Sequence, residues 1–316
     1  MTRILRIGAR ASPLAMTQAR RVQARLGAAL RLEPADHDHR LPLHPAVTAG
    51  DAAGDGPFAE AGGKGLFTRA LDEALLAGRI DLAVHSLKDA PTRLPAGVVM
   101  ACIAERGDAR DAFIAREART LADLPPGAVL GTASVRRRAQ ALHVRPDLKV
   151  TPLRGHVGTR LARLEAGAVD AMVLALAGLE RLDLAGCARS FLDPVLAPPA
   201  AGQGAIGVTA RRDDAEIRSL LATLEDPCAA IETGAERAFL AALDGSCRTP
   251  VAAYARLDDA GLTFIGETLT PDGRRRWRRE AALAPSAQMA ADAVALGDQL
   301  GRSIRAEAGD QLMWDA

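Results

Sequence analysis

The turn "GSCRTP" (residues 245–250) places a cysteine between two apolar runs, whereas a packing thiol would more naturally lie inside such a run. Gly245 and Ser246 allow close approach, and Arg248 favours the thiolate, which is the nucleophilic form of cysteine. These residue types suggest that Cys247 reacts with a ligand. By themselves they leave open a simpler interpretation, an unreactive thiol in a turn.

The stretch "HSLKDAP" (85–91) combines a cation with a carboxylate directly after a predicted buried strand, "RIDLAVHSL". Open α/β sheets bind ligands at the carboxyl ends of their strands. Lys88 could hold a substrate anion there, and Asp89 could act as a catalytic carboxylate. The alternative is an ordinary surface turn in front of a proline-containing loop.

The distribution of charge indicates a small anionic ligand. The net charge is only +1, yet residues 131–181 carry eight arginines and one lysine against four acidic residues. Aromatic residues make up 3% of the chain, so base-stacking surfaces for nucleic acid are not expected. Because guanidinium groups bind anions through a planar fork, this composition favours a small polyanion over a nucleic-acid strand.

Two positions in this segment could hold such an anion. In "GTASVRRRAQ", Thr132 and Ser134 begin a predicted helix whose free N–H groups and dipole favour negative charge. At most two of the three arginines that follow (136–138) can reach one ligand, because successive helical residues face different ways. In "LRGHVGTRL", Arg154 and Arg160 flank a turn that opens another helix. A solvated basic face is the alternative for both.

Three further motifs are assigned no chemistry. "GGKG" (62–65) has Gly65 where a phosphate loop needs Ser or Thr, and no strand precedes it, so nucleotide binding is rejected. His37 and His39 would share one face of a polar, partly exposed strand, but no third metal ligand is specified. "RRRWRR" (274–279) is predicted to be a solvated hairpin strand.

The chain shows no sign of export. No apolar run is long enough to cross a bilayer, and "MTRILRIGARASP" contains no apolar signal core, so we expect a cytoplasmic protein without a membrane partner. The four cysteines form no CxxC pairs, which predicts reduced thiols and no metal site. Packing is the expectation for Cys102, Cys187 and Cys228.

The elements that would position these residues alternate between strand and helix patterns. Residues 4–9 are predicted to form a strand, followed by a helix with Ser12 as N-cap and Pro13 at its first position. Residues 65–78 show an amphipathic helix ended by Gly78. The alternation indicates α/β layers with largely parallel sheets.

Two pairs of similar segments within the chain suggest two similar lobes. "GRIDLAVHS" (78–86) resembles "GAVDAMVLA" (167–175), and "IGARAS" resembles "LGTASV", although chance in an Ala-rich sequence could explain both. "ERGDARDAF" and "LAPPAAGQGAIGVTA" are predicted to be crossovers between the lobes, and "DAAGDGPFAEAGG" (51–63) a mobile loop. After residue 222 a helix, two strands and a last helix indicate a separate α+β domain. The predicted domains are 1–104 with 205–222, 105–204, and 223–316.

Seven motifs together resemble one family. They are "GARASPLAMTQA", "GGKGLFTRALDEALLAGRIDLAVHSLKDAPT", "GTASVRRRAQ", "LRGHVGTRL", "LALAGLERL", "PAAGQGAIGV" and "GSCRTPVAAYA". In this order the sequence resembles the porphobilinogen deaminase (hydroxymethylbilane synthase) family, densely over residues 4–255. The resemblance implies an α/β fold with two doubly wound lobes, like those of type II periplasmic binding proteins, and a smaller α+β C-terminal domain.

The resemblance also implies an activity. A dipyrromethane cofactor would be linked by a thioether to Cys247 and would prime the head-to-tail condensation of four porphobilinogen molecules with loss of ammonia. Water would then release hydroxymethylbilane. Nothing in the sequence demands more than a monomer.

The family match assigns roles to individual residues. Asp89 would stabilise the cationic azafulvene that forms as ammonia leaves, and would take part in proton transfers. The arginines would bind the acetate and propionate groups that each added ring brings. Cofactor contacts are assigned to Ser86, Lys88, Ser134, Arg136, Arg137 and Arg160, and substrate-site positions to Arg10, Ser12, Gln18, Lys64, Phe67, Arg154, Arg181 and Gln203.

Some residues depart from the family pattern, and two rival functions are considered. His156, Ser246, Ala133 and Glu60 stand where other residues are usual, which affects fine binding detail. A non-enzymatic carboxylate-binding protein of the same two-lobed fold would have no use for Asp89 or Cys247. A DNA-associated regulator would need a helix-turn-helix, and the sequence shows no convincing one.

Overall fold

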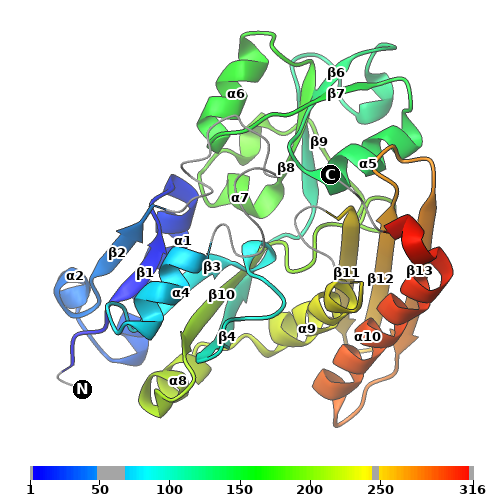
Figure 1. Cartoon of the computed structure of the whole chain (residues 1–316). Coiled ribbons are helices and arrows are strands. Elements are labelled where there is room, and N and C mark those ends of the chain that lie inside the picture. Colours follow the sequence, from blue (N-terminus) through cyan, green and yellow to red (C-terminus); the bar gives the residue numbers. More distant parts are fainter. Residues whose placement is uncertain (1–2, 48–67, 244–248, 313–316) are drawn as a thin grey trace. The chain divides into compact units, whose positions relative to one another are not determined.

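The structure, a computed structural model, describes residues 3–47, 68–243 and 249–312 (Figure 1). The chain divides into two compact units, Met1–Gly107 with Gly204–Ala230 and Asp108–Gln203 with Ile231–Ala316. The predicted mobile loop 51–63, together with Lys64, Phe67 and Cys247, lies outside the described residues. The division into three domains stays a prediction.

The first unit is built on a five-stranded sheet in the order β2-β1-β3-β10-β4. Strands β1, β2 and β3 run parallel, whereas β10 is antiparallel to both of its neighbours. The expectation of a largely parallel sheet is therefore wrong for β10, because the chain re-enters this unit at Gly204 and feeds the strand in from the opposite direction. The strands are β1 Ile7–Arg10, β2 Leu43–Ala46, β3 Leu82–Ser86, β4 Val98–Arg106 and β10 Ala205–Arg211.

Helices α1, α2, α4 and α8 belong to the same unit. Ser12 caps α1 as expected: its Oγ accepts a hydrogen bond from Ala15 N at 3.4 Å, and Pro13 opens the helix. Gly78, with φ +65°, follows the end of α4, a conformation that glycine adopts at little cost. The bounds are α1 Pro13–Ala29, α2 His37–Arg40, α4 Arg69–Leu76, α8 Ala215–Ala222, and the 3₁₀ helices η1 Pro34–Asp36 and η2 Leu87–Asp89.

The strand predicted around His37 and His39 is wrong for those residues, which form the short helix α2. In this helix the His37 side chain packs against α1. The His37 ring lies so close to Gly27 of α1 that a Cβ there would come within 2.1 Å of its Nε2. The chain becomes extended only at β2, from Leu43 onward.

The second unit contains a five-stranded sheet of order β7-β6-β8-β5-β9. Its first three strands are parallel and β5 is antiparallel to both neighbours, which repeats the pattern of the first sheet. The strands are β5 Asp111–Ala115, β6 Val129–Gly131, β7 Lys149–Thr151, β8 Ala171–Ala175 and β9 Ser190–Phe191. The helices are α5 Val135–Val144, α6 Val157–Glu165, α7 Leu176–Glu180, η3 Leu121–Asp123 and η4 Ala185–Cys187.

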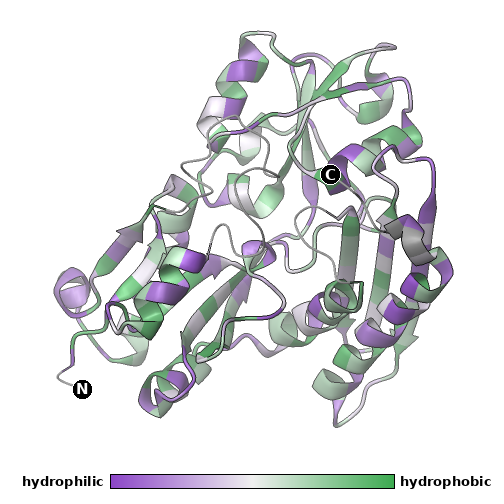
Figure 2. Ribbon diagram, in the orientation of Figure 1, coloured by the Kyte–Doolittle hydropathy of each residue, from purple (hydrophilic) through white to green (hydrophobic). Residues whose placement is uncertain are grey.

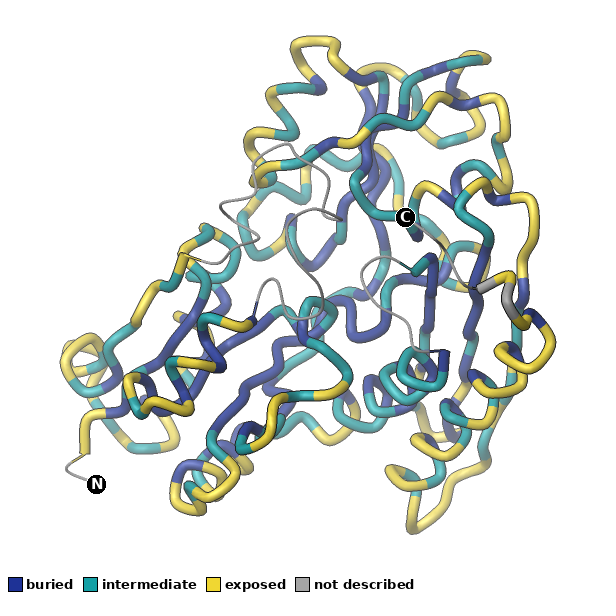
Figure 3. Tube along the Cα trace, in the orientation of Figure 1, coloured by how far each residue is buried: buried dark blue, intermediate teal, exposed yellow. Residues whose placement is uncertain are grey.

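The similar segments 78–86 and 167–175 contain equivalent strands of the two sheets. "DLAVHS" contains β3 and "DAMVLA" contains β8, the central strands of the two sheets, and both are buried along most of their length (Figure 3). Each strand is preceded by an aspartate that accepts a backbone hydrogen bond from the neighbouring strand segment. Asp81 Oδ2 accepts from Arg6 N at 2.9 Å, and Asp170 Oδ2 accepts from Val129 N at 2.7 Å. The expectation of two similarly built α/β lobes is confirmed.

The C-terminal part of the second unit is an antiparallel sheet, β11-β12-β13, covered by α9 and α10. The rings of Phe239 and Phe264 lie 5.5 Å apart in its core, and Trp277 of β13 is buried while its neighbour Arg276 is exposed. Figure 2 shows that hydrophobic and hydrophilic residues both occur in this sheet. The elements are α9 Pro227–Ala242, β11 Val251–Asp258, β12 Gly261–Leu269, β13 Arg276–Leu283, α10 Met289–Ala308 and η5 Gly309–Leu312.

The three cysteines that were expected to pack behave differently. Cys102 is buried, and burial raises the pKa of its thiol to about 12. Cys187 is half-buried. Cys228 is exposed, so the packing expectation is wrong there, because this residue lies in the first turn of α9 before the helix reaches the core. Across the described ranges, no helix is both long and apolar enough to cross a membrane.

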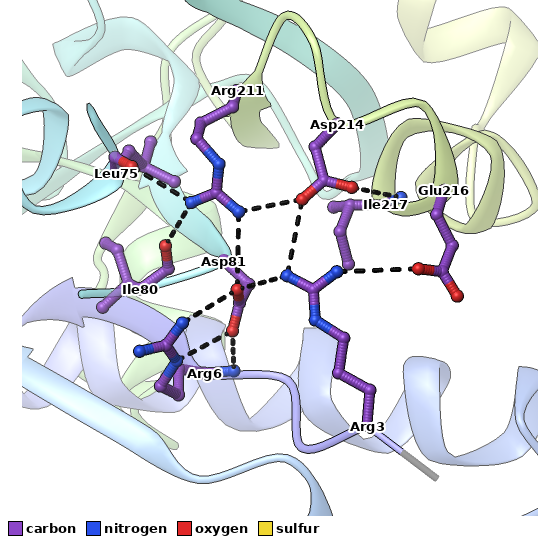
Figure 4. Close-up of polar contacts among 9 residues, drawn as sticks. All are labelled: Arg3, Arg6, Leu75, Ile80, Asp81, Arg211, Asp214, Glu216 and Ile217. Carbon is purple, nitrogen blue, oxygen red and sulfur yellow. Dashed lines mark hydrogen bonds and ion pairs between the residues drawn. The ribbon is translucent and has the colours of Figure 1, made fainter. Parts of the chain in front are cut away.

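A buried charge cluster joins β3 to the N-terminal segment (Figure 4). The side chain of Asp81 is fully buried and accepts hydrogen bonds from Arg6 Nε at 3.0 Å and Arg3 Nη2 at 2.8 Å. Arg211 Nη2 lies 3.5 Å from its Oδ1. Burial by itself would raise the pKa of Asp81, but the hydrogen bonds from Arg6 and Arg3 outweigh it and lower the pKa to about 2.

Substituting Asp81→Asn is expected to lower the free energy of unfolding at pH 7 by about 2 kcal/mol, the equivalent of this pKa shift. The contribution should be complete above the unfolded-state pKa near 4 and should decline as the pH falls toward 2, because the carboxylate then becomes protonated. Urea denaturation at pH 7 and pH 3 measures it. Asp170→Asn is the matched control, since its half-exposed carboxylate has one ion pair, with Arg116 at 3.7 Å. Equal losses in both variants would contradict the prediction.

Candidate active site

Four of the predicted residues lie together at the carboxyl ends of β1 and β3. Arg10 is the last residue of β1, Ser12 caps α1, Ser86 ends β3, and Asp89 ends the 3₁₀ turn η2 that follows. Because β1 and β3 are parallel neighbours, their carboxyl ends meet at the same edge of the sheet. All four side chains line one pocket.

The pocket pairs a cation with an accessible carboxylate. Arg10 Nη1 lies 3.9 Å from Asp89 Oδ2, and the Asp89 side chain is one-third exposed at 33%. Ser86 Oγ donates a hydrogen bond of 3.0 Å to Oε1 of the buried Gln18, which fixes the position of the Ser86 side chain. Lys88 is half-buried on the same turn. Such a site can bind a carboxylate ligand and stabilise a positive charge beside Asp89.

Two polar residues of the pocket were not predicted. His85 and Thr68 also line it, and both are buried. His85 forms a hydrogen bond of 2.9 Å between a ring nitrogen and Thr209 Oγ1 of β10. His85 was available within the quoted motif "HSLKDAP", whereas Thr68 shows no signal in the sequence beyond its place before α4.

A second group of predicted site residues lies at the start of the arginine-rich helix α5. Ser134 caps it, with Oγ accepting from Arg137 N at 3.4 Å. Two of the three successive arginines share one partner, and Arg138 is exposed. Their shared partner is a residue that the sequence analysis missed, Asp111: Arg136 Nη2 lies 2.9 Å from its Oδ2 and Arg137 Nη2 lies 2.7 Å from its Oδ1.

Asp111 lies at the start of β5 and its side chain is 1% exposed. Burial would raise its pKa, but the charges of Arg136 and Arg137 outweigh burial and lower the pKa of this carboxyl well below its usual range. Gln203 Nε2 donates to Asp111 Oδ1 at 2.9 Å. The sequence signal was an isolated acid at the head of an otherwise apolar strand, "DAFIA".

Three further arginines follow the parallel strands of the second sheet. Arg154 comes after β7, Arg160 lies in α6, and Arg181 follows α7, which comes directly after β8. All three are half-buried, and Arg160 Nε donates a hydrogen bond of 2.8 Å to Gly155 O. His156, at the N-cap of α6, makes no side-chain capping bond. Arginines therefore gather at the turns beyond the carboxyl ends of these strands.

No group of three or more His, Cys, Asp or Glu side chains within residues 3–47, 68–243 and 249–312 could hold a metal ion. The described groups suited to an organic anion are guanidinium, ammonium, hydroxyl and amide groups. The predicted site residues Lys64, Phe67 and Cys247 are outside the part of the chain that the structure describes.

Comparisons with known proteins agree on one family. A family model described as "Porphobilinogen deaminase, dipyromethane cofactor binding domain" matches residues 5–219, and one described as "Porphobilinogen deaminase, C-terminal domain" matches residues 230–306. The porphobilinogen deaminase of Caulobacter sp. (strain K31) is 53% identical over 311 residues, and that of Phenylobacterium zucineum (strain HLK1) is 49% identical over 315; each alignment covers 98% of both chains. Among solved structures, a nutrient binding protein from Burkholderia cenocepacia bound to methionine has 14% identity and a TM-score of 0.44, covering 71% of this chain and 92% of that one.

Proposed function

The chain belongs to the porphobilinogen deaminase family, and from this premise we propose a role for each residue of its site. The protein catalyses the porphobilinogen deaminase (hydroxymethylbilane synthase) reaction of tetrapyrrole biosynthesis and has a dipyrromethane cofactor-binding domain. Family membership sets aside the two rivals, a non-enzymatic carboxylate-binding protein and a DNA-associated regulator. The observation that carries the proposal is the shared pocket of Arg10, Ser12, Ser86 and Asp89.

Asp89 is the proposed catalytic residue. When ammonia leaves porphobilinogen, positive charge develops on the substrate, and a fixed carboxylate beside the pyrrole nitrogens lowers the energy of that state. Asp89 is exposed enough to face a ligand in the pocket, and it can also accept and return a proton. Arg10, 3.9 Å away, supplies the countercharge for a substrate carboxylate.

The bound dipyrromethane supplies the primer on which the substrate units are joined. Cys247 is the proposed thioether anchor, and it remains a proposal from the sequence. The described residues fit such a polycarboxylate. Arg137 is nine-tenths buried, and its Nε has no hydrogen-bond partner in the described chain, so it has donor capacity for an anion. Cofactor contacts are proposed for Ser86, Lys88, Ser134, Arg136, Arg137 and Arg160, and substrate-site positions for Arg10, Ser12, Gln18, Lys64, Phe67, Arg154, Arg181 and Gln203.

Intact mass spectrometry tests the proposal directly. The purified chain is expected to exceed its sequence mass by two pyrrole units and to turn red-violet with acidic dimethylaminobenzaldehyde. If the purified protein has the bare sequence mass, incubation with porphobilinogen should add those two units. A chain that gains no mass after this incubation would refute the covalent primer.

We further propose that the protein acts as a monomer in the cytoplasm. The sequence motifs that support the site all come from one chain, and none requires a second copy. Light scattering coupled to gel filtration should give a mass near 33.0 kDa. A dimer mass that persists on dilution would contradict the monomer.

A further inference from the structure

In the buried cluster around Asp111, one carboxylate is in direct contact with two guanidinium groups. The buried Glu267 adds a further negative charge near Arg136, and its Oε1 accepts a hydrogen bond from Gln140 Nε2 at 2.9 Å. Asp111, Arg136 and Arg137 are 1%, 5% and 10% exposed, and the two guanidinium groups share the one carboxylate. Burying a charge without a partner is costly, so each of these guanidinium groups needs an acceptor.

The two arginines are engaged very differently. Arg136 uses both terminal nitrogens within the protein: Nη1 donates to Gln140 Oε1 at 2.9 Å and to Pro198 O at 3.1 Å, and Nη2 donates to Asp111. Arg137 makes one side-chain bond in the described chain, from Nη2 to Asp111 Oδ1. The Nε atoms of both arginines lack a partner there, so the difference between them lies in the terminal nitrogens. Arg137 is therefore the member with a terminal nitrogen left for a ligand.

Asp111 also connects this pair to the crossover segment. Gln203 Nε2 donates to Asp111 Oδ1 at 2.9 Å and to Ala109 O at 2.8 Å. Three donors, one each from Arg136, Arg137 and Gln203, thus converge on one carboxylate. Only an acceptor with two oxygens and no N–H can receive them all, since an amide would turn a donor toward the guanidinium groups.

We propose that Asp111 is a positioning residue for the reaction. Arg136 donates to Oδ2 of Asp111 and fixes the position of the carboxylate. Oδ1 then orients Arg137 toward a carboxylate of the cofactor. The inference rests on the cofactor role proposed for Arg137. It adds to the cofactor contact proposed for Arg136 a second, indirect contribution through Asp111.

A double-mutant cycle on the purified holoenzyme tests this role. The readouts are the fraction of chains carrying the two extra pyrrole units, from intact mass, and the turnover per cofactor-bearing chain. Asp111→Asn and Arg137→Gln should each lower turnover per occupied chain about tenfold, and the double variant should be no slower than Arg137→Gln, because coupled residues are non-additive. Asp111→Glu, which keeps the acceptor, should recover part of the loss. Asp170→Asn, in the same sheet but outside the cluster, is the control.

Urea unfolding of each variant separates positioning from folding. A purely structural Asp111 would lower the unfolding midpoint while folded, occupied chains turned over at the wild-type rate, and this result would overturn the inference. So would losses that multiply in the double variant. If Arg137→Gln itself kept wild-type occupancy and turnover, the role proposed for Arg137 would be wrong, whatever Asp111→Asn did.

Discussion

Replacing Asp89 with asparagine is expected to lower kcat by a factor of about 10²–10⁴, the range for loss of a positioned acid–base group or of electrostatic stabilisation. Asparagine keeps the shape of the side chain but has no charge to offset the cation that forms when ammonia leaves. Because Asp89 is one-third exposed and its ion pair with Arg10 is long at 3.9 Å, the substitution should leave the fold intact. Porphobilinogen consumption and tetrapyrrole formation, normalised to cofactor-bearing chains, measure the effect.

The matched control for this prediction is Asp147→Asn. Asp147 is also an aspartate paired with an arginine, Arg145 at 2.7 Å, but it lies on the surface outside the site. Its substitution should leave kcat within about twofold of wild type, as is usual for exposed ion pairs. Near-normal turnover of Asp89→Asn would remove Asp89 from the mechanism.

Substituting Cys247→Ser is expected to abolish the covalent cofactor and, with it, detectable turnover. A serine hydroxyl is a much weaker nucleophile than a cysteine thiol near neutral pH, so it is not expected to form the covalent link. Intact mass should equal the sequence mass with the substitution, and incubation with porphobilinogen should not raise it.

Cys228→Ser controls for the loss of a reactive thiol. Cys228 is exposed and therefore accessible to reagents, yet it is expected to play no part in cofactor attachment. Its variant should carry the two extra pyrrole units and turn over normally. A covalent adduct on Cys247→Ser, or its absence from Cys228→Ser, would place the anchor elsewhere.

Local sequence patterns predicted those features of the fold that are determined by residues adjacent in the sequence. Ser12 before Pro13 predicted the start of α1, and Gly78 predicted the stop after α4, because caps and left-handed turns need particular residue types. The strand-end location of Asp89 was predictable for a similar reason, since the apolar residues 82–84 begin a short strand shortly before it. The pattern failed at His37, whose ring packs against Gly27 of α1, a contact that the local pattern does not contain.

The sequence by itself determined the family, the two-lobed plan and the residue types at the ends of the parallel strands, because motifs and strand periodicity are local properties. Only the tertiary structure decided which charges meet. Asp111 lies 25 and 26 residues from Arg136 and Arg137 and 92 from Gln203, so no spacing rule joins them. The fold brings these residues together in a buried cluster, where one carboxylate accepts hydrogen bonds from three donors. Within that cluster Arg136 uses its terminal nitrogens inside the protein, whereas Arg137 can still bind a ligand.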